Sequence, residues 1–322
     1  MDTKFIDNVL KKSSAFLTSE QILKVKELFA EEISKMSKRE MKSRKIMLKA
    51  FITAKKVEGC SDRTIGYYKY VITKFISETT TSLSQISTEE IRAYINDMME
   101  KKKVSNQSAD NTRRILSSFF AWLFEEDYIL KNPMKRIHKI KSIKKVKEVY
   151  SEEMVETIKS SCSSIRDLAI IELLSSTGMR VGELVKMNKG DVDFNSKEII
   201  VLGKGGKQRK VYFDTKTKLH LLNYFNSRID KNEAAFVSLF KPFQRLQISG
   251  VEILLRKIGR KTNIEKVHPH RFRRTLATKA IDKGMPIEQV QTLLGHAKID
   301  TTLHYAIVEQ TNVKNSYHRY LE

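Results

Sequence analysis

The 322-residue chain has only two cysteines, Cys60 and Cys162, so no framework of several disulfide bonds can hold its fold together. The two cysteines lie in different predicted domains and outside every motif described below. This use of cysteine is typical of reduced thiols in a cytoplasm.

Long hydrophobic runs are also missing. No apolar segment approaches the roughly 20 residues that a membrane-spanning helix needs. The first residues, Met-Asp-Thr-Lys-Phe, do not have the form of a secretory signal, and no lipidation motif follows. We therefore expect a soluble, cytoplasmic protein.

Acidic residues are scarce relative to basic ones. The chain has 38 Asp and Glu against 60 Lys and Arg, a formal charge of +22 and a pI near 9.8. Such a chain is expected to bind a polyanion, because neutralising phosphates releases counterions and gives an affinity that weakens steeply with salt. Charge alone does not distinguish DNA from RNA or an anionic membrane.

The length predicts about two domains, and a hydrophobic content of 40% suffices to give each domain a core. Residues 131–150 are predicted to link them. Asn132-Pro133 ends the preceding helix, and lysines then alternate with apolar residues. We predict that this linker lies along a DNA duplex, and a disordered charged connector is the alternative. The expected contacts in it are Lys139, Lys141 and Lys144.

Residues 46–130 have the pattern of a small helical domain. Helices are predicted to begin at Ser61, at Ser87-Thr-Glu-Glu90, which has the form of a capping box, and at Asn111. Apolar side chains follow each start at three- and four-residue steps, and we assign them to the core. DNA contact is left to cations that we expect to be exposed, namely Arg63, Lys69, Arg113 and Arg114.

Residues 1–45 are predicted to be helical and amphipathic, with a cationic run at 35–45. They could form a helix pair packed on the next domain, an oligomer contact or an accessory DNA arm. The sequence leaves these three roles open.

Residues 151–322 are predicted to form a mainly helical domain with a small antiparallel sheet. Strands are expected at 198–202 and 209–213, and the first is expected to extend back to residue 193. A helix headed by Arg180 is expected after a break at Gly178. The other helices are expected from 151 onward and at 165–174, 219–229, 248–260, 273–284, 287–294 and 300–308.

The most informative feature of the sequence is an ordered set of five motifs in this last domain. Basic groups that lead to a tyrosine suit cleavage of a phosphodiester without a metal. Cations can bind the non-bridging oxygens, an acid can protonate the leaving 5′-oxygen, and a phenol can attack in line. The motifs are Thr177-Gly-Met-Arg180-Val-Gly-Glu183-Leu, Val201-Leu-Gly-Lys204-Gly-Gly-Lys-Gln-Arg209, His268-Pro-His-Arg-Phe-Arg-Arg-Thr, Leu293-Leu-Gly-His296 and Thr301-Thr-Leu-His-Tyr305.

With these motifs in this order, the sequence resembles the tyrosine recombinases of the phage integrase family from about residue 47 to its end. The resemblance implies a helical core-binding domain and a catalytic domain that clamp double-stranded DNA. It implies that Arg180 and Arg273 bind the scissile phosphate through planar guanidinium forks. It also implies that Lys204, in a glycine-rich turn between two strands, is the general acid, and that Tyr305 forms a 3′-phosphotyrosyl link.

The resemblance assigns supporting roles as well. His270 fits the family's His-x-x-Arg element and is preferred over His268. Arg274 stands where many members have histidine, so the spacing from His270 is the ground for choosing Arg273. His296 is expected to support the phosphate and the nucleophile. Further expected positions are Glu183, which would orient the site, and Lys207 and Arg209, which would contact DNA.

The implied reaction conserves phosphodiester energy in a covalent link, so it is expected to be reversible and to need no cofactor or metal. The resemblance implies a homotetramer on two paired DNA sites, with integration, excision, inversion or resolution as the outcome. Whether the tail at 306–322 packs on its own subunit or on a neighbour stays open.

Three other hypotheses remain. A topoisomerase with the same tyrosine chemistry would act as a single subunit. A non-catalytic regulator would use residues 284–305 as a helix-turn-helix. A metal site could be built from histidines, but their spacing fits no common zinc pattern and no cysteine accompanies them. The histidines are His268, His270, His296 and His304.

Overall fold

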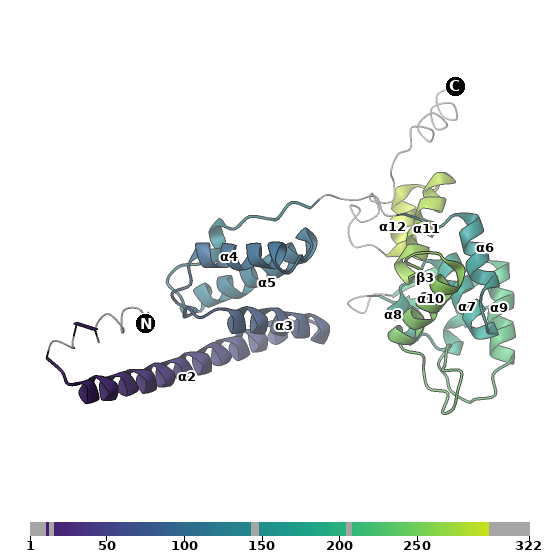
Figure 1. Ribbon diagram of the computed structural model, residues 1–322. Coiled ribbons are helices and arrows are strands. Elements are labelled where there is room, and N and C mark those ends of the chain that lie inside the picture. Colours follow the sequence, from purple (N-terminus) through teal and green to yellow (C-terminus); the bar gives the residue numbers. More distant parts are fainter. Residues whose placement is uncertain (1–10, 13–15, 143–147, 204–207, 296–322) are drawn as a thin grey trace, which may run out of the picture. The chain divides into compact units, whose positions relative to one another are not determined.

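The computed structural model describes residues 11–12, 16–142, 148–203 and 208–295 (Figure 1). The chain divides into two compact units, Met1–Lys145 and Val146–Glu322. The predicted fold class is confirmed, since the units are mainly helical and contain one small antiparallel sheet. Several predictions lie outside the described residues: Lys144, Lys204, Lys207, His296, Tyr305, the helix at 300–308 and the tail at 306–322.

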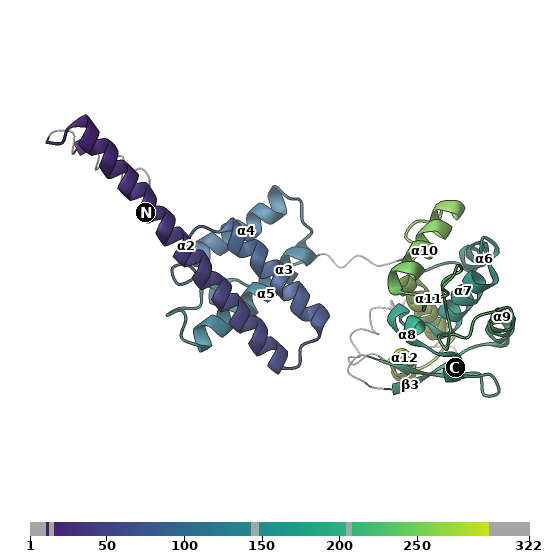
Figure 2. The same cartoon turned by 90° about the horizontal axis from the view of Figure 1, so that it is seen from below.

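The first unit begins with one long helix, α2 (Ser19–Val57). A capping box starts it: the Gln21 N–H donates to Thr18 Oγ1, and the Thr18 N–H donates to Gln21 Oε1. The helix runs unbroken through residue 45, where the sequence suggested a boundary. Figure 2 shows its amino-terminal half extending past the other helices of the unit, and Leu23 and Leu28 on it are exposed.

Three further helices pack with the carboxyl-terminal half of α2 around one core: α3 (Asp62–Glu78), α4 (Thr88–Glu100) and α5 (Asn106–Glu125). Phe51 of α2 is fully buried there. Its ring meets those of Phe119 and Trp122 edge-on, with centroids 5.2 and 5.6 Å apart.

The predicted starts of α3 and α4 are confirmed by Ser61 and the Ser87–Glu90 capping box. The predicted start of α5 at Asn111 was wrong. Ser105 caps the helix by accepting a hydrogen bond from the Ser108 N–H, so α5 begins five residues earlier than predicted. Its first turn is polar and carries no apolar stripe, and this polarity hid the start.

The end of α3 is held by a buried cation of α2. Arg44 is only 3% exposed and donates to the carbonyls of Thr79, Thr80 and Thr81 at 2.6, 2.7 and 2.7 Å. These contacts satisfy carbonyls just past the helix end that have no partner within the helix. Arg44 therefore joins the cationic run of α2 to the core.

The first part of the predicted linker is attached to this unit. After a short 3₁₀ helix, η1 (Pro133–Arg136), the chain runs beside α5. The Ile140 N–H donates to Asp110 Oδ1 at 3.0 Å, and Asn106 donates to the Lys141 carbonyl at 2.9 Å. Residues 137–142 of the linker therefore form an ordered edge of the helical unit.

The core of the second unit combines a three-stranded sheet with five helices: α6 (Glu152–Ser160), α7 (Ile165–Thr177), α9 (Thr215–Asn226), α10 (Ile248–Thr262) and α11 (Pro269–Asp282). The short helices α8 (Val181–Lys186) and α12 (Ile287–Leu294) border the site described below. The described residues contain no helix that is both long and apolar enough to cross a membrane.

The sheet has the order β1-β2-β3, with both pairs antiparallel. The predicted strand at 198–202 is confirmed as β2 (Glu198–Leu202). Its predicted extension back to residue 193 was wrong, because β1 (Val192–Asp193) is a separate strand joined to β2 by a turn. Asp193 Oδ1 forms that turn by accepting from the N–H groups of Asn195 and Ser196. Strand β3 (Gln208–Tyr212) pairs Arg209 with Val201.

The predicted starts of two helices were late. Asp214 caps α9 by accepting from the Thr217 N–H, so the helix begins at Thr215. Helix α11 begins at Pro269, because the His268 ring accepts from the Arg271 N–H. His270 and Arg273 therefore lie on the same helix.

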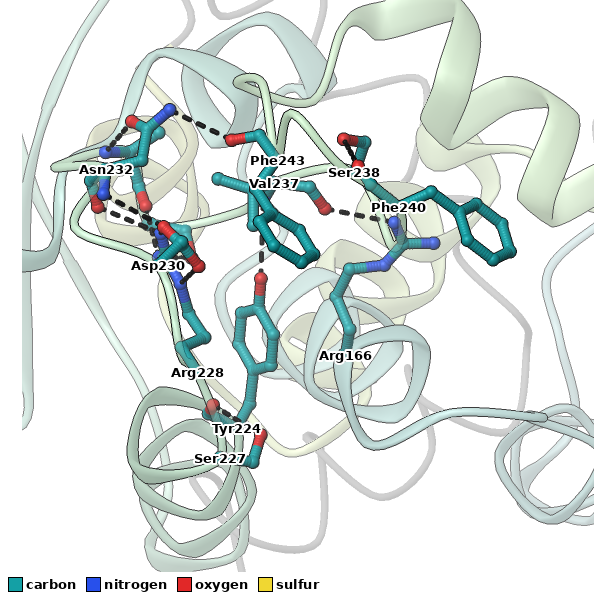
Figure 3. Close-up of polar contacts among 12 residues, drawn as sticks. Arg166, Tyr224, Ser227, Arg228, Asp230, Asn232, Val237, Ser238, Phe240 and Phe243 are labelled. Atoms are coloured by element: carbon teal, nitrogen blue, oxygen red, sulfur yellow. Dashed lines mark hydrogen bonds and ion pairs between the residues drawn. The ribbon is translucent and has the colours of Figure 1, made fainter.

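The segment between α9 and α10 is held by buried polar contacts (Figure 3). Arg228 binds Asp230 and donates to the Asn232 carbonyl, and Arg166 of α7 donates to the Val237 carbonyl. The hydrogen bonds from Arg228 are the largest influence on Asp230 and lower its pKa to about 2. The segment is thus fixed despite having almost no regular structure.

Candidate active site

Arg180 follows a turn that favours glycine. Gly178 ends α7 with φ of +58°, and a Cβ there would lie 2.8 Å from Leu276 Cδ2. The chain then turns into α8, for which Arg180 is the N-cap residue. Its guanidinium donates to Glu183 Oε1 at 2.9 Å and to the Gly295 carbonyl at 3.0 Å.

Arg273 reaches the same place from α11. It is only 3% exposed. Its guanidinium donates to the Gly178 carbonyl at 2.9 Å and to the Leu294 carbonyl. The sequence left the choice between Arg273 and Arg274 to spacing alone, and the structure brings Arg273 to the carbonyls beside Arg180.

Arg209 approaches from β3. Its two Nη atoms bind Glu183 as a fork, at 2.6 Å to Oε1 and 2.7 Å to Oε2. Its Nε donates to the Leu293 carbonyl at 3.3 Å. The side chain is 12% exposed. The sequence placed Arg209 among the DNA contacts, whereas the structure places its guanidinium inside the protein.

Glu183 is the carboxylate that these cations share. Burial acts to raise its pKa, but the hydrogen bonds from Arg209 and Arg180 outweigh burial and hold the pKa below its usual range. The Arg180 N–H also donates to Oε2 at 2.8 Å. Glu183 is therefore ionised at neutral pH and fixed by four donors.

Three arginines thus bind three consecutive carbonyls at the end of α12. Arg209 binds Leu293, Arg273 binds Leu294, and Arg180 binds Gly295. A helix carboxyl end carries partial negative charge and unpaired carbonyls, so cations are stabilised there. With one carboxylate among them, the four side chains have a net charge of +2. We call Arg180, Glu183, Arg209 and Arg273 the arginine cluster.

The two candidate histidines differ in their surroundings. The His268 Nδ1 accepts a hydrogen bond from the Arg271 N–H and so caps the start of α11. His270 lies exposed in the first turn of α11, one helical turn before Arg273. The preference for His270 over His268 stays a prediction.

Known families match both units. The model of the phage integrase family matches residues 144–311, and that of the phage integrase N-terminal SAM-like domain matches residues 47–130. The chain is 32% identical over 284 residues to the tyrosine recombinase XerC of Leptospira interrogans, covering 84% of this chain and 91% of that protein. This chain belongs to the phage integrase family of tyrosine recombinases.

The recombinase has other relatives of similar length. It is 28% identical over 278 residues to XerC of Pediococcus pentosaceus, covering 81% of this chain and 92% of that protein. The fold is shared with a λ integrase dimer bound to a COC′ core site, with a TM-score of 0.68, 21% identity and coverage of 80% and 75% of the two chains. It is also shared with XerH bound to a palindromic difH substrate, with a TM-score of 0.67, 21% identity and 83% of each chain covered. The chain is a site-specific DNA recombinase.

Sequence reasoning missed a contact at the start of α11 of the recombinase. The Arg271 guanidinium lies 4.2 Å from the centroid of the Tyr150 ring and donates to the Glu265 carbonyl at 2.7 Å. The Tyr150 hydroxyl accepts from the His268 N–H, and burial raises the pKa of this tyrosine to about 12. Tyr150 ends the basic linker, and nothing in its sequence context signals the pairing with Arg271.

The predicted DNA contacts of the first unit divide into two groups. Arg113 was expected to be exposed, and this was wrong: it is half-buried and binds Asp110 Oδ1 at 2.7 Å. Burial acts to raise the pKa of Asp110, but the bonds from Arg113 and the Ile140 N–H lower it overall. The exposed members are Arg63, Lys69, Arg114, Lys139 and Lys141.

Metal ligands are absent from the described ranges, in which no group of three or more His, Cys, Asp or Glu side chains could hold an ion.

Proposed function

We propose that Arg180 and Arg273 of the arginine cluster bind the scissile phosphate of duplex DNA and that Tyr305 attacks it. The Tyr305 oxygen would bond to phosphorus, the bond from phosphorus to the 5′-oxygen would break, and Lys204 would protonate the leaving oxygen. A 3′-phosphotyrosyl link and a free 5′-hydroxyl result. The observation that carries this proposal is the convergence of Arg180 and Arg273 on the end of α12, directly before His296.

A net positive site suits this chemistry for two reasons. Guanidinium groups remain charged at any working pH and match the geometry of phosphate oxygens. A phenol has an ordinary pKa of about 10, and nearby cations favour the phenolate that attacks. We assign His270 and His296 to proton transfer and to support of the phosphate and nucleophile.

We further propose that the two units have different roles in DNA binding and catalysis. Residues 46–130 would form the core-binding domain, 131–150 the linker and 151–322 the catalytic domain, with 1–45 as an extension. The λ integrase and XerH structures contain DNA sites, and we propose double-stranded DNA as the partner of this chain. A homotetramer would hold two sites and exchange strands in pairs.

A covalent-trapping assay tests the chemistry. DNA fragments that flank the native gene would be nicked beside candidate cleavage positions, so that the cleaved strand end diffuses away. We expect a protein–DNA adduct on denaturing gels, unchanged by a chelator, and its complete loss in Tyr305→Phe. Tyr317→Phe and Tyr320→Phe are matched controls, and we expect both to retain the adduct.

Two other outcomes of this assay would contradict the proposal. An adduct that persists in Tyr305→Phe would assign the nucleophile elsewhere. Adduct formation with relaxation of supercoils by a monomer would support a topoisomerase instead. Sedimentation of the trapped complex measures its stoichiometry, and we expect four subunits on two DNA sites.

A further inference from the structure

Arg209 belongs to the strand that follows the lysine motif, yet its guanidinium is built into the arginine cluster. It makes a two-pronged contact with Glu183 and a third bond with the Leu293 carbonyl. These bonds connect β3, α8 and the end of α12. A side chain that only met DNA would need none of them.

Close packing at Gly295 holds Arg209 in place. Gly295 has φ of +63°, and a Cβ on it would lie 2.7 Å from Arg209 Cδ and 3.0 Å from Nε. The Gly295 backbone, whose carbonyl accepts a hydrogen bond from Arg180, therefore packs directly against the Arg209 side chain. Any movement of Arg209 would disturb the carbonyl contact of Arg180.

Charge gives Arg209 a second effect on Arg180. Glu183 Oε1 accepts from both arginines, at 2.9 Å from Arg180 and 2.6 Å from Arg209. Without Arg209, the buried carboxylate would be paired with Arg180 alone, and that pair would have no net charge. A neutral pair stabilises a phosphate transition state less than a cation does.

We infer that Arg209 is a positioning residue, which neutralises Glu183 and supports Gly295 so that Arg180 keeps its charge and its place for phosphate. This inference rests on the proposed function, in which Arg180 binds the scissile phosphate. It assigns Arg209 an effect on the rate of cleavage and little effect on DNA affinity.

The test compares cleavage rate with affinity. In Arg209→Gln we expect adduct formation at saturating DNA to slow by roughly 100-fold, the scale of a misplaced catalytic group. The dissociation constant for the same DNA should change by less than about threefold. Arg209→Lys keeps a charge beside Glu183 and should stay within about tenfold of the wild-type rate.

Lys210→Gln is the matched control. Lys210 is the next residue on β3, its side chain is 57% exposed, and it pairs with Glu198 at 2.7 Å. Removing this charge should leave the cleavage rate within about twofold. Thermal unfolding of every variant sets an assay temperature at which all are folded.

A double-mutant cycle separates this role from general structural damage. Glu183→Gln removes the carboxylate that Arg180 and Arg209 both bind, so Arg209 has no negative charge left to neutralise. In this background, adding Arg209→Gln should slow cleavage by less than about tenfold. Equal effects in both backgrounds would overturn the inference. So would a loss of affinity at an unchanged saturated rate, which would make Arg209 a DNA contact. Failure of the wild-type chain to form any adduct would instead overturn the proposed function, and this inference with it.

Discussion

At the scale of single residues, the cations of this chain are not equivalent, although composition counts them alike. Arg44 and Arg273 are each 3% exposed, and both donate hydrogen bonds to backbone carbonyls at or near helix ends. Arg63 and Lys69 are exposed. The count of 60 Lys and Arg therefore overstates the number of cations that can contact a phosphate backbone, because some of them stabilise the fold.

The Arg228–Asp230 pair gives a residue-scale prediction about pH. The folded pKa of Asp230, about 2, lies below its ordinary value of 3.8, so the pair stabilises the fold above pH 3.8 and loses this effect as pH falls through the folded pKa. We expect Asp230→Asn to lower the free energy of unfolding by about 2 kcal/mol near neutral pH. The deficit should shrink by about 1 kcal/mol between pH 6 and pH 3.

Urea denaturation of both proteins at the two pH values measures this difference. Asp62→Asn, at an exposed position in the first turn of α3, controls for the removal of one carboxylate. A deficit that does not change with pH would mean that Asp230 acts through the shape of its loop rather than through its charge.

At the scale of elements, capping residues made many boundaries predictable. Ser61, Ser87 and Ser151 each begin a helix where the sequence predicted one. The starts of α5 and α11 were missed because polar first turns precede the apolar stripe.

The arginine cluster was predictable only in part. Motif spacing identified Arg180, Arg273 and Glu183, but strand register decides that Arg209 points at Glu183, and no local pattern reports register.

The turn between α7 and α8 gives an element-scale prediction. In Gly178→Ala, the positive φ and the contact of the new Cβ with Leu276 should lower the free energy of unfolding by about 1–3 kcal/mol. The cleavage rate should also fall, because the Gly178 carbonyl accepts a hydrogen bond from Arg273. Gly190→Ala, where a Cβ would meet nothing within 4 Å, should change stability by less than about 0.5 kcal/mol. Similar losses of stability in both variants would show that the turn at residue 178 has no particular need for glycine.

At the scale of the whole molecule, basic groups on the linker extend the first unit. Lys139 and Lys141 are exposed, and hydrogen bonds to Asp110 and Asn106 hold the backbone beside them. The sequence predicted these lysines as contacts but could not show that the segment is ordered. That order depends on partners some thirty residues away, beyond the reach of a local pattern.

Salt dependence of DNA binding tests the linker. If each lysine neutralises one phosphate, Lys139→Gln with Lys141→Gln should make the slope of log affinity against log salt less negative by about 2. Lys101→Gln with Lys102→Gln removes the same charge, but these lysines already pair with Asp97 and Glu78 and should alter the slope much less. Equal changes in the two double variants would indicate a response to net charge alone.

Helix α2 has a practical consequence for following this recombinase at work. At a rise of about 1.5 Å per residue, its 39 residues make a rod of roughly 58 Å. One end carries Phe51 into a packed core, and the other presents exposed Leu23. A spectroscopic label at Leu23 would therefore move rigidly with the core of the first unit. The distance from this label to a second label on bound DNA would report the orientation of the unit at each stage of strand exchange.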